Sequence, residues 1–321
     1  MKKILSKILL GSAVWCFAFS AQALTYTLAP VGNPGNVEDD TGFGAVASAY
    51  QIGVYEVSIG QYTEFLNAVA ATDTYALYNG AMGGIPNVAG ISRSGSPGTY
   101  TYAVIINSGS SANRPVTSVS WFHAARFANW MANGQPVGSQ NATTTEDGAY
   151  TLNGATSGVV PTKNAINPNT SSAPTFYIPS ENEWYKAAYY NPTLNSGAGG
   201  YTTYATQSDD VPGNLIGADL NQANYLSETT GYSVTQSADF STTQNYLTDG
   251  GSYTANASYY GSFDQTGSIW EWNDMDGSAT TIRGFRGGAY TSTPPYLRSS
   301  YRMGYVADGY NANGGFRLAA P

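Results

Sequence analysis

The 321-residue sequence has very few of the side chains that bind transition metals. It contains one cysteine and one histidine, and thiolates and imidazoles are the usual protein ligands for zinc, copper and iron. Charge is scarce as well, since 11% of the residues are charged against about 25% in typical soluble domains. We therefore expect a surface covered largely by Ser, Thr, Asn, Gly and Tyr.

Residues 1–23 have the pattern of a secretory signal peptide. Three lysines precede an apolar run over residues 8–19, and an A-x-A cleavage site ends at Ala23. The run is too short for a stable transmembrane helix. We expect an exported protein, periplasmic or secreted, that begins at Leu24 and has no membrane association after cleavage.

The single cysteine, Cys16, lies inside this predicted signal peptide. The mature protein would then contain no cysteine. That absence excludes disulfides, zinc thiolates, iron–sulfur clusters and cysteine nucleophiles.

Cleavage would also make the protein more acidic. Residues 1–23 hold three of the 13 lysines and arginines and none of the 21 acidic residues, so the formal net charge moves from −8 to −11. Nucleic acids and anionic membranes are therefore poor candidate partners. Half of the remaining positive charge is gathered near the C-terminus, at Arg283, Arg286, Arg298, Arg302 and Arg317.

Three segments are predicted to be helical. Each has a serine that can cap the first turn, and two of them add the Gln or Glu of a capping box. An apolar face follows each cap. The caps and faces are Ser58 with Gln61 before 59–69, Ser118 or Ser120 before 121–131, and Ser180 with Glu183 before 184–188.

Regular structure is otherwise sparse. Alternating apolar residues predict strands at 49–57, 100–106, 282–290 and 315–318. Residues of about 133–175 and 193–262 are rich in Gly, Ser, Thr, Asn and Ala without periodicity, which indicates long loops. No linker divides the chain, so we expect one domain over 24–321.

A series of short motifs spans nearly the whole mature chain. In this order it resembles the formylglycine-generating enzyme, or sulfatase-modifying factor, family, whose patterns include V-S-W, R-L-P-[ST]-E-x-E-W, G-N-x-W-E-W, R-G-G-S-[WY] and G-F-R. The resemblance implies an α+β, loop-rich single domain similar to C-type lectin folds. The matching segments are Tyr55-Glu56-Val57-Ser58, Val119-Ser120-Trp121, Ile178-Pro179-Ser180-Glu181-Asn182-Glu183-Trp184, Gly267-Ser268-Ile269-Trp270-Glu271-Trp272, Arg286-Gly287-Gly288-Ala289-Tyr290 and Gly315-Phe316-Arg317.

The same resemblance implies bound calcium. A carboxylate between two tryptophans, such as Glu271, needs a cation, an arginine or several donors if it is buried. Oxygen-only coordination suits a chain with so little histidine and cysteine. The implied ligands are main-chain oxygens near Thr266, Gly267 and Ile269 with the Glu271 carboxylate in one site, and the Asn224 side chain with the Tyr225 carbonyl in a second.

The catalytic cysteines of the family are missing. Their positions fall on Ser292 and Leu297, and the serine of the G-G-S segment falls on Ala289. A hydroxyl and an alkyl group cannot replace two thiolates on copper(I), so no copper site is expected and the oxidase chemistry should be lost. His123, the one histidine, is expected at a surface or in helix packing.

Two functions follow as hypotheses. The first is a calcium-stabilised binding or structural module, a pseudoenzyme whose extracellular ligand is a glycan, peptide or protein. The second is another enzyme on this scaffold, either a carboxylate-based hydrolase or a metal-dependent oxidase. Arg283, Arg286 and Arg317 are predicted to form internal salt bridges. The ligand-binding candidates are Trp270, Trp272, Tyr290, Ser292, Tyr296, Arg298 and Arg302.

Overall fold

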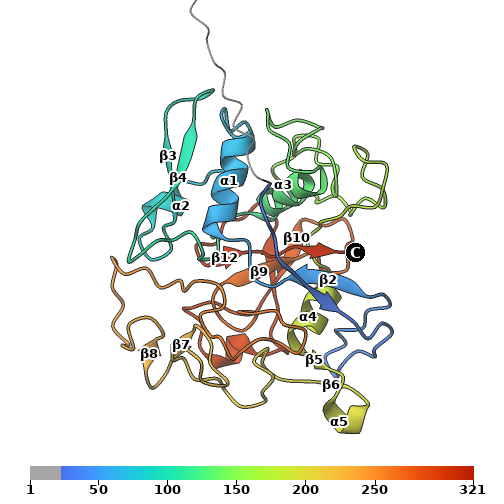
Figure 1. The fold of residues 1–321 in the computed structure, drawn as a ribbon, viewed down its shortest axis with the longest axis vertical. Helices are drawn as coiled ribbons and strands as arrows, with labels where there is room; N and C mark the ends of the chain where they lie inside the picture. The colour runs from blue at the N-terminus through green and yellow to red at the C-terminus, as the bar shows by residue number, and fades with distance from the viewer. Residues whose placement is uncertain (1–22) are drawn as a thin grey trace, which may run out of the picture.

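The computed structural model describes residues 23–321 (Figure 1). The predicted signal peptide lies outside the described residues except for Ala23, so signal cleavage and export stay predictions. Within the described residues, no helix is long and apolar enough to cross a membrane.

The three predicted helices are present with their predicted caps. Ser58 and Ser180 each complete a capping box, and Ser120 accepts the His123 N–H at the start of the third helix. The helices are α1 (Ile59–Val69), α2 (Ala81–Gly84), α3 (Trp121–Ala132), α4 (Glu181–Tyr189) and α5 (Leu194–Gly197), with a 3-10 turn η1 (Pro294–Leu297).

The strands are short and form several small sheets. They are β1 (Leu28–Val31), β2 (Tyr50–Gly53), β3 (Ile91–Ser94), β4 (Thr101–Val104), β5 (Tyr190–Asn191), β6 (Gly200–Tyr201), β7 (Leu226–Ser227), β8 (Gly231–Tyr232), β9 (Trp270–Asn273), β10 (Ile282–Arg286), β11 (Met303–Val306), β12 (Gly314–Gly315) and β13 (Ala319–Ala320).

The central sheet has the order β11-β10-β9-β12. Its β9 strand pairs antiparallel with β10 and parallel with β12. A second sheet has the order β1-β2-β13, which joins the two ends of the described chain. Figure 1 shows the central sheet across the middle of the molecule, with α1 and α3 above it and α4 below. This mixture of short helices and sheets is the predicted α+β fold.

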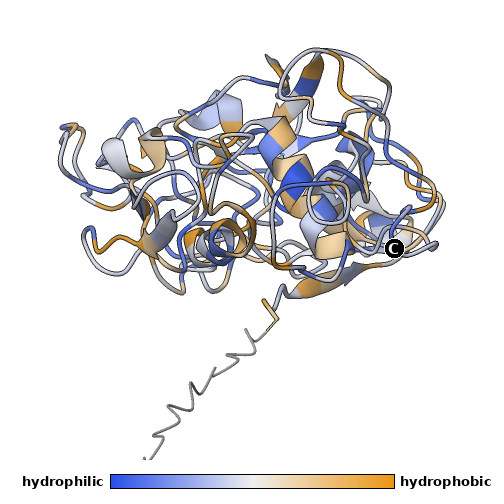
Figure 2. Cartoon of the chain, turned by 90° about the horizontal axis from the view of Figure 1, so that it is seen from above, coloured by the Kyte–Doolittle hydropathy of each residue, from blue (hydrophilic) through white to orange (hydrophobic). Residues whose placement is uncertain are grey.

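The main core lies between the first helices and the central sheet. Every residue of α3 is buried, and Phe127 on this helix contacts Phe65 of α1 and Phe316 near β12, with ring centroids 5.2 and 5.5 Å apart. Edge-on aromatic pairs of this kind add to the free energy gained by burying their area. In Figure 2, hydrophobic and hydrophilic bands alternate along the helices, as expected for elements with one buried face.

Three of the four predicted strands are present in shortened form, as β2, β4 and β10. The prediction for 315–318 is wrong for 316–318, since only Gly315 lies in a strand, at the end of β12. The β10 strand ends at Arg286 because Gly287 and Gly288 follow with φ of +93° and +82°, outside the extended region. Residues 133–175 contain no helix or strand, and residues 193–262 contain only α5, β6, β7 and β8. Both are long loops, as predicted.

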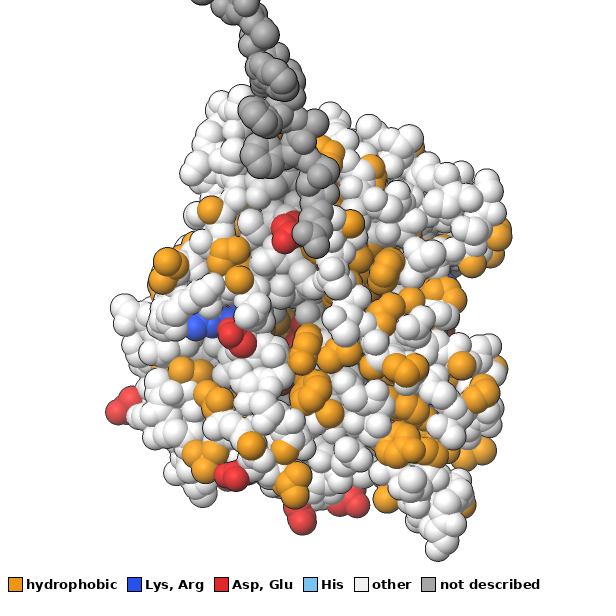
Figure 3. Space-filling view, in the orientation of Figure 1, with side chains coloured by type: hydrophobic (Ala, Val, Ile, Leu, Met, Phe, Trp, Pro, Cys, Tyr) orange, Lys and Arg blue, Asp and Glu red, His pale blue; other side chains and the backbone are white. Residues whose placement is uncertain are grey.

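The surface carries little charge. On the face drawn in Figure 3, a few acidic and basic side chains lie among polar and scattered hydrophobic ones. This pattern follows from the low charged fraction of the sequence.

Candidate functional site

The two positions that hold cysteines in active relatives lie beside each other. A Cβ added at Gly288 would be 2.5 Å from Leu297 Cδ2 and 3.5 Å from Ser292 Cβ. The Ser292 hydroxyl oxygen accepts the Ala289 N–H at 2.9 Å. The local backbone therefore brings the two positions together although neither carries a thiol.

The space at these positions is filled. Leu297 is fully buried and packs in a cluster with Tyr204, Ala223 and Tyr225, and Ser292 is 7% exposed. Pro294 and Pro295 begin the η1 turn that presents Leu297 to this cluster. Substrate could not reach a reactive group here without displacing the leucine.

An open cleft lies on the other side of the same turn. It has a volume of about 610 Å³, which is in the range of small-ligand sites. One wall is the loop around β7 and the other is η1 with Arg298. Its lining residues include Val211, Pro212, Asn214, Leu215, Tyr225, Glu228, Thr229, Thr230, Pro294, Pro295 and Arg298.

Side-chain hydrogen bonds hold the loop wall of this cleft in place. Asn214 Nδ2 donates to the Gly231 carbonyl at 2.7 Å, and its Oδ1 accepts the Thr230 hydroxyl at 2.7 Å. The Tyr225 hydroxyl donates to the Pro212 carbonyl. A loop without periodic secondary structure therefore still forms a defined wall.

Arg298 is the arginine without an ion pair in residues 23–321. The other seven arginines each lie within 4 Å of a carboxylate oxygen. Arg298 is exposed and lines the cleft. Its guanidinium is thus available to a ligand, as predicted.

The predicted internal salt bridges are present. Arg283 Nε lies 2.7 Å from Asp274, and Arg286 Nη2 lies 2.8 Å from Glu181. Arg302, a predicted ligand-binding residue, also pairs with Glu181, at 2.7 Å. The Arg302 guanidinium therefore already has an ion-pair partner within the protein. This pairing is not predicted from the sequence.

The Glu271 carboxylate meets an arginine. Arg317 donates to both Glu271 oxygens, at 2.6 and 2.8 Å, and Trp184 Nε1 donates to one of them at 2.9 Å. Glu271 and Arg317 are both fully buried. As placed here, Glu271 does not fit the calcium role that the resemblance implies, because a guanidinium occupies both oxygens.

The other implied calcium ligands lie next to one another. Asn224 and Gly267 form a β-bridge, and a Cβ at Gly267 would be 2.3 Å from the Asn224 carbonyl oxygen. Asn224 Nδ2 donates to the Tyr246 carbonyl at 3.0 Å, and the Tyr225 carbonyl accepts the Ser233 hydroxyl at 3.3 Å. Ile269 is buried beside this bridge. The segments meet, but protein groups satisfy several of their polar atoms.

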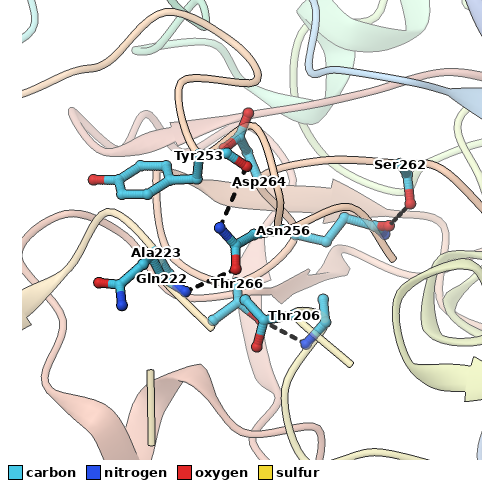
Figure 4. Close-up of a pocket in the computed structure, with 10 residues that line it drawn as sticks. Thr206, Gln222, Ala223, Tyr253, Asn256, Ser262, Asp264 and Thr266 are labelled. Carbon is cyan, nitrogen blue, oxygen red and sulfur yellow. Dashed lines mark hydrogen bonds between the residues drawn. The ribbon is translucent and has the colours of Figure 1, made fainter. Parts of the chain in front are cut away.

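Thr266 lines a small polar cavity in the same region (Figure 4). Its volume of about 10 Å³ is close to the lower limit for one water molecule. Asp264 and Asn256 also line it. Across residues 23–321, no group of three or more His, Cys, Asp or Glu side chains is arranged to hold a metal ion. A calcium site built mainly from main-chain and amide oxygens, as the resemblance implies, needs no such group, so calcium stays a prediction.

The aromatic candidates are mostly inside the protein. Trp272 is fully buried and stacks on Phe285, with ring centroids 3.9 Å apart. Trp270 and Tyr290 are 8% and 4% exposed. Tyr296, at 43% exposure, is the aromatic candidate on the surface near the cleft.

His123 has a packing role. It is 2% exposed, and its ring centroid is 5.3 Å from that of Tyr310. Burial, with a smaller effect of Arg126, lowers the pKa of His123 to about 3. Of the two expected places, surface and helix packing, the second is correct.

No periodic pattern in the sequence indicates the loop wall of the cleft. Residues 211–230 lie in the aperiodic stretch, and their contacts, such as that between Asn214 and Thr230, are tertiary. Glu181 is part of a family motif, but the motif does not reveal that its carboxylate pairs with two arginines. The clustering of arginines near the C-terminus could have suggested a shared carboxylate.

The fold and motifs define a sulfatase-modifying-factor protein. A family model described as the sulfatase-modifying factor enzyme 1-like domain matches residues 40–321, so the chain belongs to this family. The described residues contain no cysteine, which is consistent with the loss of the family's catalytic cysteines.

One solved structure supports the fold, and two others have lower similarity. The crystal structure of CarF has a TM-score of 0.52 and 20% identity, covering 93% of this chain and 99% of that one. Treponema denticola variable protein 1 has a TM-score of 0.46 and 16% identity, and the match covers 94% of this chain and 97% of that one. PvdO from Pseudomonas aeruginosa has a TM-score of 0.44 and 16% identity, and the match covers 92% of each chain. A comparison with curated proteins finds no match.

Proposed function

We propose that this chain is an exported, non-oxidising member of its family that binds a carboxylate-bearing extracellular ligand in the cleft beside η1. The observation that carries the proposal is the free guanidinium of Arg298 in a cleft of about 610 Å³. Arginine suits this role because its planar fork recognises carboxylates through two hydrogen bonds.

The other lining residues of the cleft suit a peptide, protein or glycan ligand. Val211 and Leu215 are 47% and 51% exposed, and they offer apolar contact beside the charged group. Thr229 and Thr230 supply hydroxyls along the same wall. A ligand with one carboxylate next to an apolar or sugar surface would satisfy both parts of the cleft.

Binding of acidic peptide and glycan arrays tests the proposal. We expect Arg298→Ala to weaken binding of the best ligand by about tenfold or more, since a charge-assisted contact is lost, and Arg298→Lys to restore part of it. Arg93→Ala is the matched control, because Arg93 is a partly exposed arginine that pairs with Asp73 elsewhere. Equal binding by the wild type and Arg298→Ala would refute the assignment.

The loss of oxidase activity is a separate part of the proposal. Leu297 and Ser292 provide no thiolate to bind copper(I). A peptide with the sulfatase motif Cys-x-Pro-x-Arg, incubated with the protein, copper and oxygen, should yield no aldehyde by mass spectrometry. Aldehyde formation above the protein-free control would contradict it.

A carboxylate-based hydrolase is the second candidate. A pocket of about 260 Å³ is lined by Glu183, Asp274 and Asp276. Burial raises the pKa of Asp274 to about 7, although Arg283 opposes the shift. A carboxyl with a raised pKa near a second carboxylate favours acid–base hydrolysis. Turnover of nitrophenyl glycosides that Asp274→Asn abolishes would favour this function. The metal-dependent oxidase has no comparable support in the described residues.

A further inference from the structure

A further pocket, separate from the cleft, lies next to a buried group of side chains in which carboxylates outnumber cations. Three carboxylates, those of Glu56, Asp264 and Glu271, interact with the single guanidinium of Arg317. If all three were ionised, the group would carry two uncompensated negative charges. Buried charges are stable only when they are paired.

Arg317 cannot neutralise the whole group. Its Nε and one Nη2 hydrogen go to Glu271, and the other Nη2 hydrogen goes to the Phe263 carbonyl. Its Nη1 group donates to the Gly53 and Val54 carbonyls. All five N–H groups are therefore used, and the nearest Glu56 oxygen is 3.8 Å away.

Within residues 23–321, Glu56 has only a distant ion pair with Arg317 and no hydrogen bond at its Oε1 atom. The residue is 3% exposed, and its buried Oε1 accepts no hydrogen bond from any described residue. Burial and the neighbouring Asp264 raise the pKa of the Glu56 carboxyl well above its usual range, against the opposing effect of Arg317. This shift favours the protonated form of the Glu56 carboxyl, and a bound cation would favour the ionised form.

Glu56 also lines a pocket of about 300 Å³ that opens to the surface. Tyr26 and Tyr55 form part of its wall, and Asn113 and Asp249 complete it. The Asp249 side chain is 49% exposed and lies 3.9 Å from Arg114, so it is only weakly paired. The pocket lining thus combines a buried and an exposed acidic side chain with two tyrosines.

These features favour an organic cation over a metal ion as the ligand of this pocket. The pocket is far larger than a single ion, and residues 23–321 hold no group of three or more His, Cys, Asp or Glu arranged for a metal. Aromatic faces attract ammonium and guanidinium groups. An alkyl chain would cover the tyrosine rings while its charged end approached Glu56.

We propose that the pocket formed by Tyr26, Tyr55, Glu56, Asn113 and Asp249 binds a primary ammonium or guanidinium group carried on an alkyl chain. The cation pairs with the Glu56 carboxylate, and the proton that Glu56 held is released to solvent. The group can belong to a free amine or to a lysine or arginine side chain of a partner.

Calorimetric titration of the full mature protein at pH 7 tests the site, with n-butylammonium, n-butylguanidinium and N-acetyl-lysine amide as probes. We expect binding with net proton release, detected by repeating the titration in buffers of different ionisation enthalpy. Glu56→Gln keeps the shape but removes the charge, and it should weaken binding by about tenfold or more. N-acetyl-lysine amide binding more tightly than the free amine would identify a protein side chain as the source.

Two control variants accompany the titration. Glu64→Gln removes an exposed carboxylate of α1 and should leave binding unchanged, and so should Arg298→Ala in the separate cleft. If Glu56→Gln fails to fold, Tyr55→Leu removes an aromatic wall and should weaken binding instead. The proposal is overturned by no binding of any probe, by equal binding to Glu56→Gln, or by Glu56-dependent binding of calcium chloride with none of the organic cations.

Discussion

At the scale of single residues, this protein buries six of the ten lysines and arginines in residues 23–321, among them five arginines. Arg126, Arg283, Arg286 and Arg317 are each at most 1% exposed, and each meets a carboxylate. Removing one partner of such a pair leaves an uncompensated buried charge, which typically costs about 3–5 kcal/mol. The exceptions are Arg298, which has no ion pair within residues 23–321, and Glu56, whose ion pair with Arg317 spans 3.8 Å. These two residues are for that reason the strongest candidates for binding.

His123 gives the stability of the protein a dependence on pH. Its folded-state pKa is about 3, below the unfolded value of about 6.5. The unfolded chain therefore takes up a proton first as the pH falls, so stability is present above pH 6.5 and is lost between about 6.5 and 3. His123→Phe should lose about 1.5 kcal/mol less free energy of unfolding than the wild type between pH 6.5 and 5.

Urea unfolding of both proteins at several pH values measures this difference. Carboxylates that titrate in the same range are common to both proteins and cancel in the comparison. Parallel curves of unfolding free energy against pH would show that His123 takes up its proton without loss of the fold.

At the scale of elements, local chemistry predicted some parts of the fold and tertiary contacts determined others. The helices α1 and α4 follow from capping boxes that the sequence spells out at Ser58 and Ser180. The strand β9 could not be predicted from alternation, because Trp270 to Asn273 are all buried and both faces are covered. Strands of two residues, such as β12, exist only through pairing with neighbours.

The candidate sites also combine features that the sequence predicts with features that depend on tertiary contacts. The motif order places the family's cysteine positions on Ser292 and Leu297, which stays a prediction. The partner of Glu271 was not predicted, since Arg317 lies 46 positions later and only the fold brings them together. The pocket at Glu56 joins residues as distant as Tyr26 and Asp249, which no local pattern can reveal.

The capping box of α4 should contribute measurably to stability. Ser180 accepts the Glu183 N–H, and the Glu183 carboxylate accepts the Ser180 N–H at 2.8 Å. Ser180→Ala should lower the free energy of unfolding by about 1 kcal/mol, because one N–H of the first turn loses its acceptor. Ser180→Asp keeps an acceptor and should retain most of the stability.

Chemical denaturation of the two variants measures these changes. The control is Ser300→Ala, which truncates an exposed serine in a turn outside the helices and strands. Equal losses for Ser180→Ala and Ser180→Asp would place the effect in packing instead of capping.

At the scale of the whole molecule, one loop-rich domain is held together without any cysteine in its described residues. A core of aromatic residues from α1, α3 and the central sheet carries the fold. The ion pair of Glu271 and Arg317 joins β9 to the C-terminal segment, and Trp184 of α4 adds a third element to it. In this arrangement an arginine fills the place that the family resemblance gives to calcium.

Calcium removal distinguishes these two roles of Glu271. Because Arg317 and Trp184 already occupy the Glu271 oxygens, EDTA should leave the melting temperature of the wild type unchanged. Glu271→Gln should lower the free energy of unfolding by about 3–5 kcal/mol, since it leaves Arg317 as an unpaired buried charge. That loss should be the same with EDTA and with added calcium.

Glu64→Gln, which removes an exposed carboxylate from α1, is the matched control and should change stability by less than about 0.5 kcal/mol. Thermal unfolding followed by circular dichroism measures all three proteins under both conditions. A lower melting temperature of the wild type in EDTA, with no such effect in Glu271→Gln, would show that calcium reaches this carboxylate. The arginine would then share Glu271 with the ion, and the calcium site implied by the family would stand.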